Sequence, residues 1–275
     1  MNHRIPNILS IAGVDPSGGA GILADIKAMS ALGGFGAAVV AALTAQNTHA
    51  VTAIHPVPHE FVAQQIDTLF ADVRIDAVKI GMLGQKQVTR TVAERMAHWK
   101  PAHLVLDPVM IAKSGDSLLE RAAVDELRES LLPLATVITP NLPEAGVLLD
   151  ARPPENLKEM RHAAEKLRRL LAHSGERWVF LKGGHLPGDE TIDVIHDGDR
   201  MIELPGTRIH TKNTHGTGCT LSAALATLLP QSATVPDAAQ AAKNYLIGAI
   251  AASGQLSVGT GHGPVQHFHA WWPKP

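Results

Sequence analysis

A glycine-rich segment in the last quarter of the sequence has the composition of an anion-binding loop. Residues 214–220 read Thr-His-Gly-Thr-Gly-Cys-Thr, and an alanine-rich helix is predicted to follow over residues 221–229. Glycines allow backbone amides to point into one concavity, and the N-terminus of a helix adds partial positive charge. Alternatively, the segment is a tight turn into a helix, with Cys219 as a small buried side chain. This segment alone does not decide between the two interpretations.

Carboxylate and amide side chains follow two apolar runs and could organise a magnesium ion. Asp107 comes directly after residues 104–106, and Asn141 and Glu144 follow residues 137–138. Mg²⁺ prefers one or two carboxylates together with waters and substrate phosphates. Glu144 could instead be an acid in the first turn of a helix that a proline starts.

Lys182 stands between an apolar run and a double glycine, an unusual place for a solvated lysine. Its ammonium group could hold a nucleotide phosphate as a point charge. The alternative is a lysine at a strand end whose side chain reaches solvent, and Lys182 taken alone favours that alternative.

The first glycine-rich segment, residues 13–21, favours close approach of a small substrate to the backbone. It is not a Walker A loop, because no Gly-Lys-Ser/Thr follows, and its glycine spacing matches the dinucleotide fingerprint poorly. Asp25 lies one turn into the helix predicted after this segment and could face the same pocket. It could also be an acid that stabilises the first turn of that helix.

Apolar, β-branched runs alternate with segments of helical periodicity along most of the chain. Strands are predicted over residues 8–14, 37–43, 77–80, 104–106, 137–138 and 179–181. Helices are predicted over residues 61–70, 88–98, 122–132, 157–171, 218–229 and 236–252. This order predicts a mainly parallel sheet with helices on both faces. Residues 191–204 break the order, and Asp197-Gly198-Asp199 predicts a hairpin turn and hence an antiparallel edge.

The polar and glycine-rich segments fall where such a sheet would bring them together. Doubly wound sheets bind ligands outside the carboxyl ends of their strands. Four predicted strands end in such segments, which are residues 15–21, 107–108, 139–141 and 182–185. We therefore expect one common site at this edge of the sheet.

Bulk composition narrows the class of protein. The 275 residues are 45% hydrophobic, with no linker or repeat, which predicts a single domain over residues 1–275. A net charge of -2 without a basic cluster argues against nucleic-acid binding. Cys219, the single cysteine, is typical of a reducing cytosol. The sequence shows no signal peptide or membrane-spanning run, so a cytoplasmic protein that does not bind membranes is expected.

The whole ordered set of segments resembles the hydroxymethylpyrimidine/phosphomethylpyrimidine kinases, a thiamin-pathway family of the ribokinase-like superfamily. The segments that carry the resemblance cover nearly the whole chain: residues 13–21 with Asp25, 44–48, 76–83, 106–110, 113–116, 139–145, 182–185, 213–220, 261–265 and 267–269. Any one match is weak, but the ordered set is specific. The resemblance implies a three-layer α/β/α ribokinase-like fold with a mainly parallel central sheet and an antiparallel edge.

The resemblance also implies ATP-dependent phosphorylation of 4-amino-5-hydroxymethyl-2-methylpyrimidine and of its monophosphate. The residues that would line the pyrimidine pocket are Gly13, Asp25, Gln46, Met82 and Val109. The Gln46 amide would pair with the ring edge, because it offers both a donor and an acceptor to an aminopyrimidine.

The phosphate-transfer residues are likewise carried over by position from the family. Asp107 and Glu144 would organise Mg²⁺, with Asn141 nearby. Lys182 would contact nucleotide phosphate, and Thr211 and Lys243 would border the nucleotide. The anion hole that stabilises the transferring phosphoryl group would consist of Gly216, Thr217 and Gly218.

The last residue of this loop separates the pyrimidine kinases from their sugar-kinase relatives, in which an aspartate takes the proton of the attacking hydroxyl. Here the position is Cys219. A helix N-terminus can lower the pKa of a thiol, so the sequence predicts a thiolate that serves as the base.

Two other functions compete with this prediction. Pyridoxal kinase is the nearest, and Gln46 argues against it because an apolar residue there would favour the bulkier pyridoxal ring. A non-catalytic pyrimidine-binding regulatory module would be expected to lose its phosphate-transfer residues, yet Lys182, Glu144 and Cys219 all remain. The family further implies a homodimer, and residues 113–116 are the predicted mobile flap.

Overall fold

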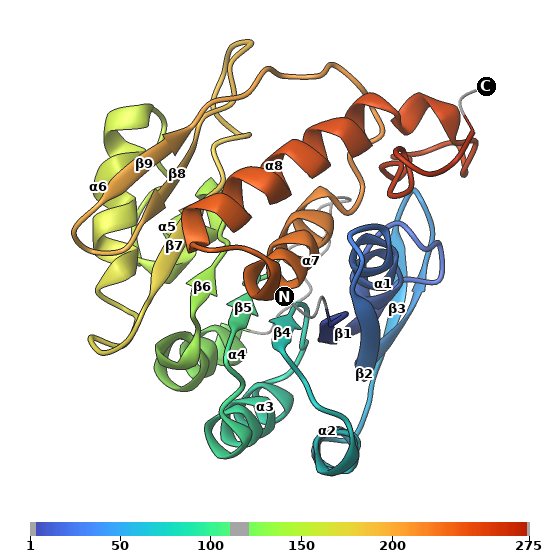
Figure 1. The fold of residues 1–275 in the computed structure, drawn as a ribbon, viewed down its shortest axis with the longest axis vertical. Helices are drawn as coiled ribbons and strands as arrows, with labels where there is room; N and C mark the ends of the chain where they lie inside the picture. The colour runs from blue at the N-terminus through green and yellow to red at the C-terminus, as the bar shows by residue number, and fades with distance from the viewer. Residues whose placement is uncertain (1–3, 111–120, 274–275) are drawn as a thin grey trace.

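The computed structural model describes residues 4–110 and 121–273. In these residues nine strands form one sheet, in the order β3-β2-β1-β4-β5-β6-β7-β8-β9 (Figure 1). The strands are β1 (Asn7–Val14), β2 (Phe35–Gln46), β3 (Val51–Pro56), β4 (Ala77–Ile80), β5 (Leu104–Leu106), β6 (Val137–Ile138), β7 (Trp178–Leu181), β8 (Asp193–His196) and β9 (Met201–Leu204). The predicted flap, residues 113–116, lies outside the described residues.

The centre of the sheet is parallel and both of its edges are antiparallel. Neighbouring strands from β2 across to β7 pair in parallel. β8 and β9 continue the sheet as an antiparallel hairpin, closed by a hydrogen bond from the Asp197 amide to the Arg200 carbonyl. This confirms the predicted antiparallel edge. The opposite edge strand, β3, pairs antiparallel with β2 and was not predicted.

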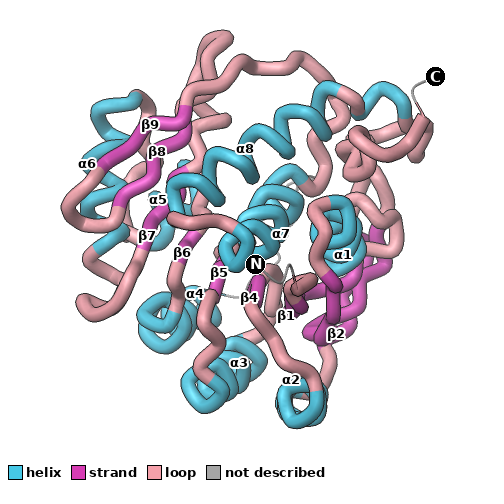
Figure 2. Tube along the Cα trace, in the orientation of Figure 1, coloured by secondary structure: helices cyan, strands magenta, loops and turns pink. Residues whose placement is uncertain are grey.

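Helices cover both faces of the sheet, as the alternation of strands and helices predicts (Figure 2). One face packs against α1 (Gly21–Ala31), α7 (Thr217–Leu228) and α8 (Val235–Ala251). The other face packs against α2 (His59–Asp72), α3 (Lys86–Trp99), α4 (Arg121–Glu126), α5 (Leu142–Leu148) and α6 (Leu157–Arg168). The three-layer α/β/α prediction is confirmed.

Alternation along the strands sorts side chains between the two hydrophobic layers. In β1, Leu9 and Ile11 belong to the core under α2–α6, whereas Ile8 belongs to the core under α1, α7 and α8. In β4 the same alternation sends the side chain of Lys79 toward α1, where it is fully buried. A charged group thus lies inside a largely apolar layer.

The helix predicted over residues 122–132 forms as three short pieces. α4 continues into a π-helical turn, Leu127–Leu131, and then a 3₁₀ turn, Leu132–Leu134. Pro133 lies in that last turn, and a proline cannot donate the backbone hydrogen bond that a longer α-helix would need. Within the described part of the chain, none of the helices has the length and hydropathy needed to cross a bilayer.

The segment after α8 folds back over the N-terminal part of the molecule. Trp271 donates its indole N–H to the carbonyl of Ala31, at the end of α1, and His215 pairs with Pro264 as an isolated β-bridge. Figure 1 shows this red segment beside the blue α1. Residues from both ends of the sequence therefore meet near the N-terminus of α7.

Candidate active site

A cavity of about 390 Å³ lies at the carboxyl ends of the parallel strands, where the sequence predicts a common site. Its lining comes from the residues that follow β1, β4, β5, β6 and β7, from the end of β2, and from the start of α7. The sequence-predicted residues that line it are Gly13, Gln46, Met82, Asp107, Val109, Asn141, Glu144, Lys182, Gly216, Thr217, Gly218 and Cys219.

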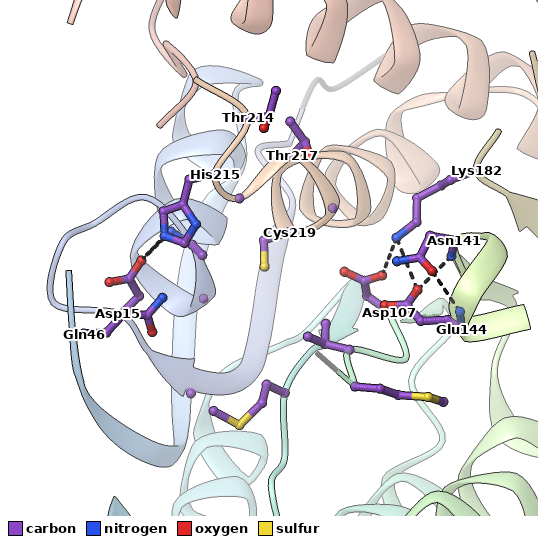
Figure 3. Close-up of a pocket in the computed structure, with 18 of the residues that line it drawn as sticks. Asp15, Gln46, Asp107, Asn141, Glu144, Lys182, Thr214, His215, Thr217 and Cys219 are labelled. Atoms are coloured by element: carbon purple, nitrogen blue, oxygen red, sulfur yellow. Dashed lines mark hydrogen bonds and ion pairs between the residues drawn. The ribbon is translucent and has the colours of Figure 1, made fainter. Parts of the chain in front are cut away.

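Two groups of labelled side chains lie on opposite sides of Cys219 in the cavity (Figure 3). One group contains Lys182, Asp107 and Glu144. The other contains Gln46 and the hydrogen-bonded pair of Asp15 and His215. The cavity therefore has one highly charged end and one end with an amide, and a thiol stands at the middle.

The charged end centres on a buried ion pair. Lys182 Nζ lies 2.9 Å from Asp107 Oδ1 and 3.8 Å from Glu144 Oε2. Thr139 donates its hydroxyl to Asp107 Oδ1 at 3.0 Å. Burial disfavours charge on both partners, yet the pairing holds the pKa of Asp107 below and the pKa of Lys182 above their usual ranges. Lys182 is thus not the solvated strand-end lysine of the alternative interpretation.

Glu144 serves the helix and the cavity together. Asn141 and Glu144 form a capping box at the start of α5, in which Glu144 Oε2 accepts the Asn141 amide at 2.7 Å. The interpretation of Glu144 as an acid in the first turn of a helix is therefore correct, although Glu144 also lines the cavity. Burial also raises the pKa of Glu144 to about 7, although Lys182 opposes this shift. The carboxyl is poised between its two protonation states near neutral pH.

The raised pKa of Glu144 predicts a loss of stability as the pH increases. Between the unfolded pKa of about 4.5 and the folded pKa of about 7, the folded protein binds more protons, so the free energy of unfolding decreases across this window. The contribution is on the order of 3 kcal/mol. Glu144→Gln keeps a side chain able to form the capping box, so its urea-unfolding free energy should lack this decrease.

The difference in unfolding free energy between wild type and Glu144→Gln isolates this group from the rest of the titration. Glu159 is the matched control, because hydrogen bonding to Arg152 lowers its pKa to about 2. Glu159→Gln should therefore leave the curve unchanged between pH 4.5 and 7, and should lack only the increase in unfolding free energy that the wild type shows between about pH 2 and 4.5. Parallel curves for wild type and Glu144→Gln from pH 4.5 to 7 would contradict the raised pKa.

The side chains at the charged end are of the types that bind a magnesium ion. Two carboxylates, Asp107 and Glu144, flank one ammonium group, which shows that the position suits a cation. Over residues 4–110 and 121–273, no three His, Cys, Asp or Glu side chains cluster as a metal-binding group. A bound magnesium ion would consequently need waters and nucleotide phosphates for its remaining ligands, as is usual for this ion.

The predicted anion-hole loop, residues 214–220, is built around a left-handed glycine. Gly216 has φ 76°, and a Cβ there would collide with the carbonyl oxygen of Gly19. The conformation places Gly216 at the N-cap of α7, so that the helix begins at Thr217 and Thr220 N–H bonds to the Gly216 carbonyl at 2.8 Å. The first backbone amides of this 12-residue helix have no partner within it and lie at the cavity.

Cys219 lines the cavity as predicted, but the prediction of a lowered thiol pKa is wrong. Burial raises the pKa of Cys219 to about 11, although Lys79 opposes the shift. Removal of water around the sulfur outweighs the helix N-terminus, because a thiolate loses its hydration there. The side chain is therefore a thiol at neutral pH.

The amide end of the cavity depends on close packing. A Cβ on Gly13 would lie 2.7 Å from Met82 Cε, so the glycine leaves room for the methionine side chain. Gln46, the last residue of β2, contacts the hydroxyl of Thr44 at 3.1 Å on the same face of the strand. The Gln46 side chain therefore lines the cavity while it contacts Thr44.

Three residues predicted for the site do not line the cavity. Asp25 is fully buried beneath it, where it accepts hydrogen bonds from Ser10 at 2.6 Å and from Lys79 at 2.8 Å. Its carboxylate is therefore paired within the core, and the residue does not line the cavity. The available signal for this pairing was Lys79, a lysine in the middle of the apolar strand β4, which needs a buried acidic partner. Lys79 itself lines the cavity.

The other two residues are Lys243 and Thr211. Lys243 is buried, lies 2.9 Å from Asp193 Oδ2, and donates to the carbonyl of Leu204. It ties α8 to the β8–β9 hairpin. The Thr211 hydroxyl accepts the Asn213 amide within its own loop. Neither residue borders the cavity that Figure 3 shows.

Sequence reasoning missed the pair of Asp15 and His215. Asp15 Oδ2 and His215 Nε2 are 2.7 Å apart, and both side chains are buried. Although burial opposes ionisation, hydrogen bonds from His215 and Ser17 hold the pKa of Asp15 below its usual range. One residue lies in each of the two glycine-rich segments. Because both segments were predicted to line one site, a contact between them could have been predicted.

The fold and the cavity define a small-molecule kinase with the ribokinase-like architecture, and comparison with known proteins agrees. The ADP complex of pyridoxal kinase from Bacillus subtilis is 32% identical, with a TM-score of 0.87, and covers 97% of this chain and 99% of its own. Phosphomethylpyrimidine kinase from Clostridium difficile is 35% identical, with a TM-score of 0.78, and covers 90% of this chain and all of its own.

Sequence comparison narrows the class further. The family model described as phosphomethylpyrimidine kinase matches residues 15–266. Hydroxymethylpyrimidine/phosphomethylpyrimidine kinase from Escherichia coli K12 is 51% identical over 268 residues, which is 97% of this chain and 98% of that protein. The chain belongs to the phosphomethylpyrimidine kinase family.

Proposed function

We propose that this enzyme transfers a phosphoryl group from ATP to 4-amino-5-hydroxymethyl-2-methylpyrimidine, and then to the resulting monophosphate, in thiamin biosynthesis. One observation carries the proposal. A single cavity holds an amide for an aminopyrimidine at one end and the Asp107–Lys182–Glu144 cluster at the other, with the anion-hole loop between them.

The charged end is the proposed place of the nucleotide phosphates. Asp107 and Glu144 would hold Mg²⁺, which neutralises charge on the phosphates when it is bound. Lys182, now paired with Asp107, has its ammonium group within reach of the same space and would contact a phosphate oxygen. The ion pair keeps these groups in place before the nucleotide binds, so that little reorganisation is needed.

The anion-hole loop would stabilise the phosphoryl group during transfer. The amides at the start of α7 have no partner within the helix, are donors fixed by the backbone, and lie beside Cys219. Phosphoryl transfer depends more on such positioning and charge stabilisation than on covalent chemistry by the protein. The attacking oxygen of the pyrimidine would lie near the Cys219 sulfur.

The test is an ADP-release assay with MgATP and three acceptors: hydroxymethylpyrimidine, its monophosphate and pyridoxal. Turnover on both pyrimidines, with pyridoxal poor, is the expected result. Turnover on pyridoxal alone would make the enzyme a pyridoxal kinase, a function favoured by its likeness to the Bacillus subtilis structure. Pyrimidine binding without turnover on any acceptor would identify a regulatory module.

Thr44 offers a prediction about pyrimidine recognition. Its hydroxyl has one proton to donate, either to the Val14 carbonyl at 2.9 Å or to Gln46 Oε1 at 3.1 Å, and the second contact favours one orientation of the Gln46 side chain. Thr44→Val removes the hydroxyl with little change of shape. It should raise KM for hydroxymethylpyrimidine about threefold to tenfold, with kcat nearly unchanged, because the amide is then free to rotate.

Steady-state kinetics of Thr44→Val and Thr44→Ser measure this effect. The serine variant keeps the hydroxyl and should bind the pyrimidine nearly as the wild type does. An unchanged KM in Thr44→Val would show that Gln46 needs no support from its neighbour.

We also propose that residues 1–275 act as one kinase domain, in a cytoplasmic homodimer. The single sheet that runs from β3 to β9 supports the domain proposal, and the family resemblance supports the homodimer. Light scattering on the purified protein tests the dimer, and a monomer at micromolar concentration would refute it.

A further inference from the structure

A buried hydrogen bond joins the two glycine-rich loops of the cavity across 200 positions of sequence. His215 Nε2 lies 2.7 Å from Asp15 Oδ2. Only 6% of the surface of His215 and 3% of that of Asp15 are exposed. Because a carboxylate oxygen can only accept, Nε2 carries the proton and His215 donates it. This bond ties the loop that follows β1 to the loop that precedes α7.

Asp15 also fixes the shape of its own loop. Its Oδ1 accepts the Ser17 amide at 2.8 Å, and its Oδ2 accepts the Ser17 hydroxyl at 2.8 Å and the Ala20 amide at 3.0 Å. Ala20 is the N-cap residue of α1. One carboxylate therefore holds together a turn, the start of a helix and the imidazole of the second loop.

The two loops also interlock sterically. A Cβ on Gly19 would collide with the His215 ring, and a Cβ on Gly216 would collide with the Gly19 carbonyl oxygen. Both glycines are needed for this close approach of the loops. If the imidazole were displaced, the contact between His215 and Gly19 would be lost. The position of Gly216 thereby depends on His215 staying against Gly19.

Backbone contacts hold the other side of His215. Its amide donates to the Gly263 carbonyl at 3.0 Å, and the residue forms a β-bridge with Pro264. His215 is thus fixed between the first loop and the C-terminal segment. The next residue along the chain is Gly216, the N-cap of α7.

We propose that Asp15 and His215 are positioning residues that lock the anion-hole loop against the first glycine-rich loop, so that the amides of residues 216–218 face the transferring phosphoryl group. The inference rests on the proposed kinase function. The hydrogen bond acts through the backbone it holds, and neither residue takes part in proton transfer. Figure 3 shows the two side chains pointing at each other, with Cys219 between them and the Asp107–Lys182–Glu144 cluster.

Kinetics of two substitutions at position 215 test the role. His215→Ala removes the donor, and His215→Gln keeps an amide N–H that can reach Asp15 without a titratable ring. We expect His215→Ala to lower kcat at least about tenfold with KM for hydroxymethylpyrimidine changed less than about threefold, because displaced amides weaken transition-state binding. His215→Gln should recover kcat to within about fivefold of the wild type.

Ser17→Ala is the matched control, since it too removes a side-chain donor to Asp15, here a hydroxyl, but leaves the contact between the loops. Its kcat should stay within about twofold of the wild type. A kcat near that of the wild type in His215→Ala would overturn the proposal. Equal losses in His215→Ala and His215→Gln would also overturn it, because they would assign the effect to the imidazole ring itself.

Folding and the kinase function are checked separately. Should His215→Ala fail to fold, Gly19→Ala provides the same readout, because its methyl group displaces the imidazole while every hydrogen-bonding group remains. An inactive wild-type enzyme would refute the proposed function instead. The pair is then tested by the affinity for the magnesium complex of a non-hydrolysable ATP analogue, whose terminal phosphoryl group would meet the loop amides. We expect this affinity to fall about tenfold in His215→Ala and to recover in His215→Gln; equal affinities in all three proteins would refute the pair's role.

Discussion

Asp107→Asn is expected to lower kcat by roughly a hundredfold to a thousandfold, the largest effect of any single substitution at the charged end of the cavity. Asp107 is almost fully buried and neutralises Lys182 at 2.9 Å. The amide keeps the volume of the side chain but removes its charge. The proposed magnesium site then has one carboxylate, and Lys182 keeps only the more distant Glu144.

The fall in kcat should be measured by ADP release at saturating MgATP, with KM for the pyrimidine as an internal check. Since Gln46 lies at the other end of the cavity, that KM should change little. Ser222→Ala is the matched control, because Ser222 lies 3.3 Å from Asp107 Oδ2 and carries no charge. An Asp107→Asn variant as active as Ser222→Ala would exclude Asp107 from phosphate transfer.

Cys219→Ala is expected to lower kcat on hydroxymethylpyrimidine at least about a hundredfold while the protein stays folded, if the sulfur takes the proton of the attacking alcohol. The raised pKa of about 11 also predicts how kcat depends on pH. The thiolate is the minor species at neutral pH, and its fraction increases tenfold per pH unit below the pKa. The kcat of the wild type should therefore rise with pH between about 7 and 9.

The slope of log kcat against pH is the measurement, made for the wild type and for Cys219→Ala on the same pyrimidine. The variant should lose the slope along with the rate. Melting temperatures report folding, and they should differ little, since the substitution removes a single sulfur atom. A pH-independent kcat in the wild type, or near-normal turnover in Cys219→Ala, would remove the base role.

The parallel part of the fold could be predicted because its strands are buried on both faces. β4, β5 and β6 were predicted at their observed bounds, since short apolar runs between polar loops leave little choice of register. β3 was missed for the opposite reason. Residues Val51–Pro56 form an exposed edge strand, so no apolar alternation marks it.

Site residues that directly follow a strand could be predicted from the sequence. Residues whose position depends on how the helices pack on the sheet could not. Asp107, Asn141 and Lys182 follow strands, and the sheet brings them together. Lys243 was assigned to the nucleotide, but packing of α8 on the β8–β9 hairpin buries it against Asp193. Asp25 fails similarly, because its partner Lys79 is 54 positions away and becomes a neighbour only when α1 covers the sheet.

The β-bridge between His215 and Pro264 bears on when the enzyme becomes functional during its synthesis. The ribosome delivers the chain from its N-terminus, so the sheet, α1 and α7 emerge before the residues that hold the anion-hole loop from behind. A nascent chain that ends before Gly263 has the glycines of that loop but not their support. Catalytic competence should therefore come late in translation, only after nearly the whole of this sequence has left the exit tunnel.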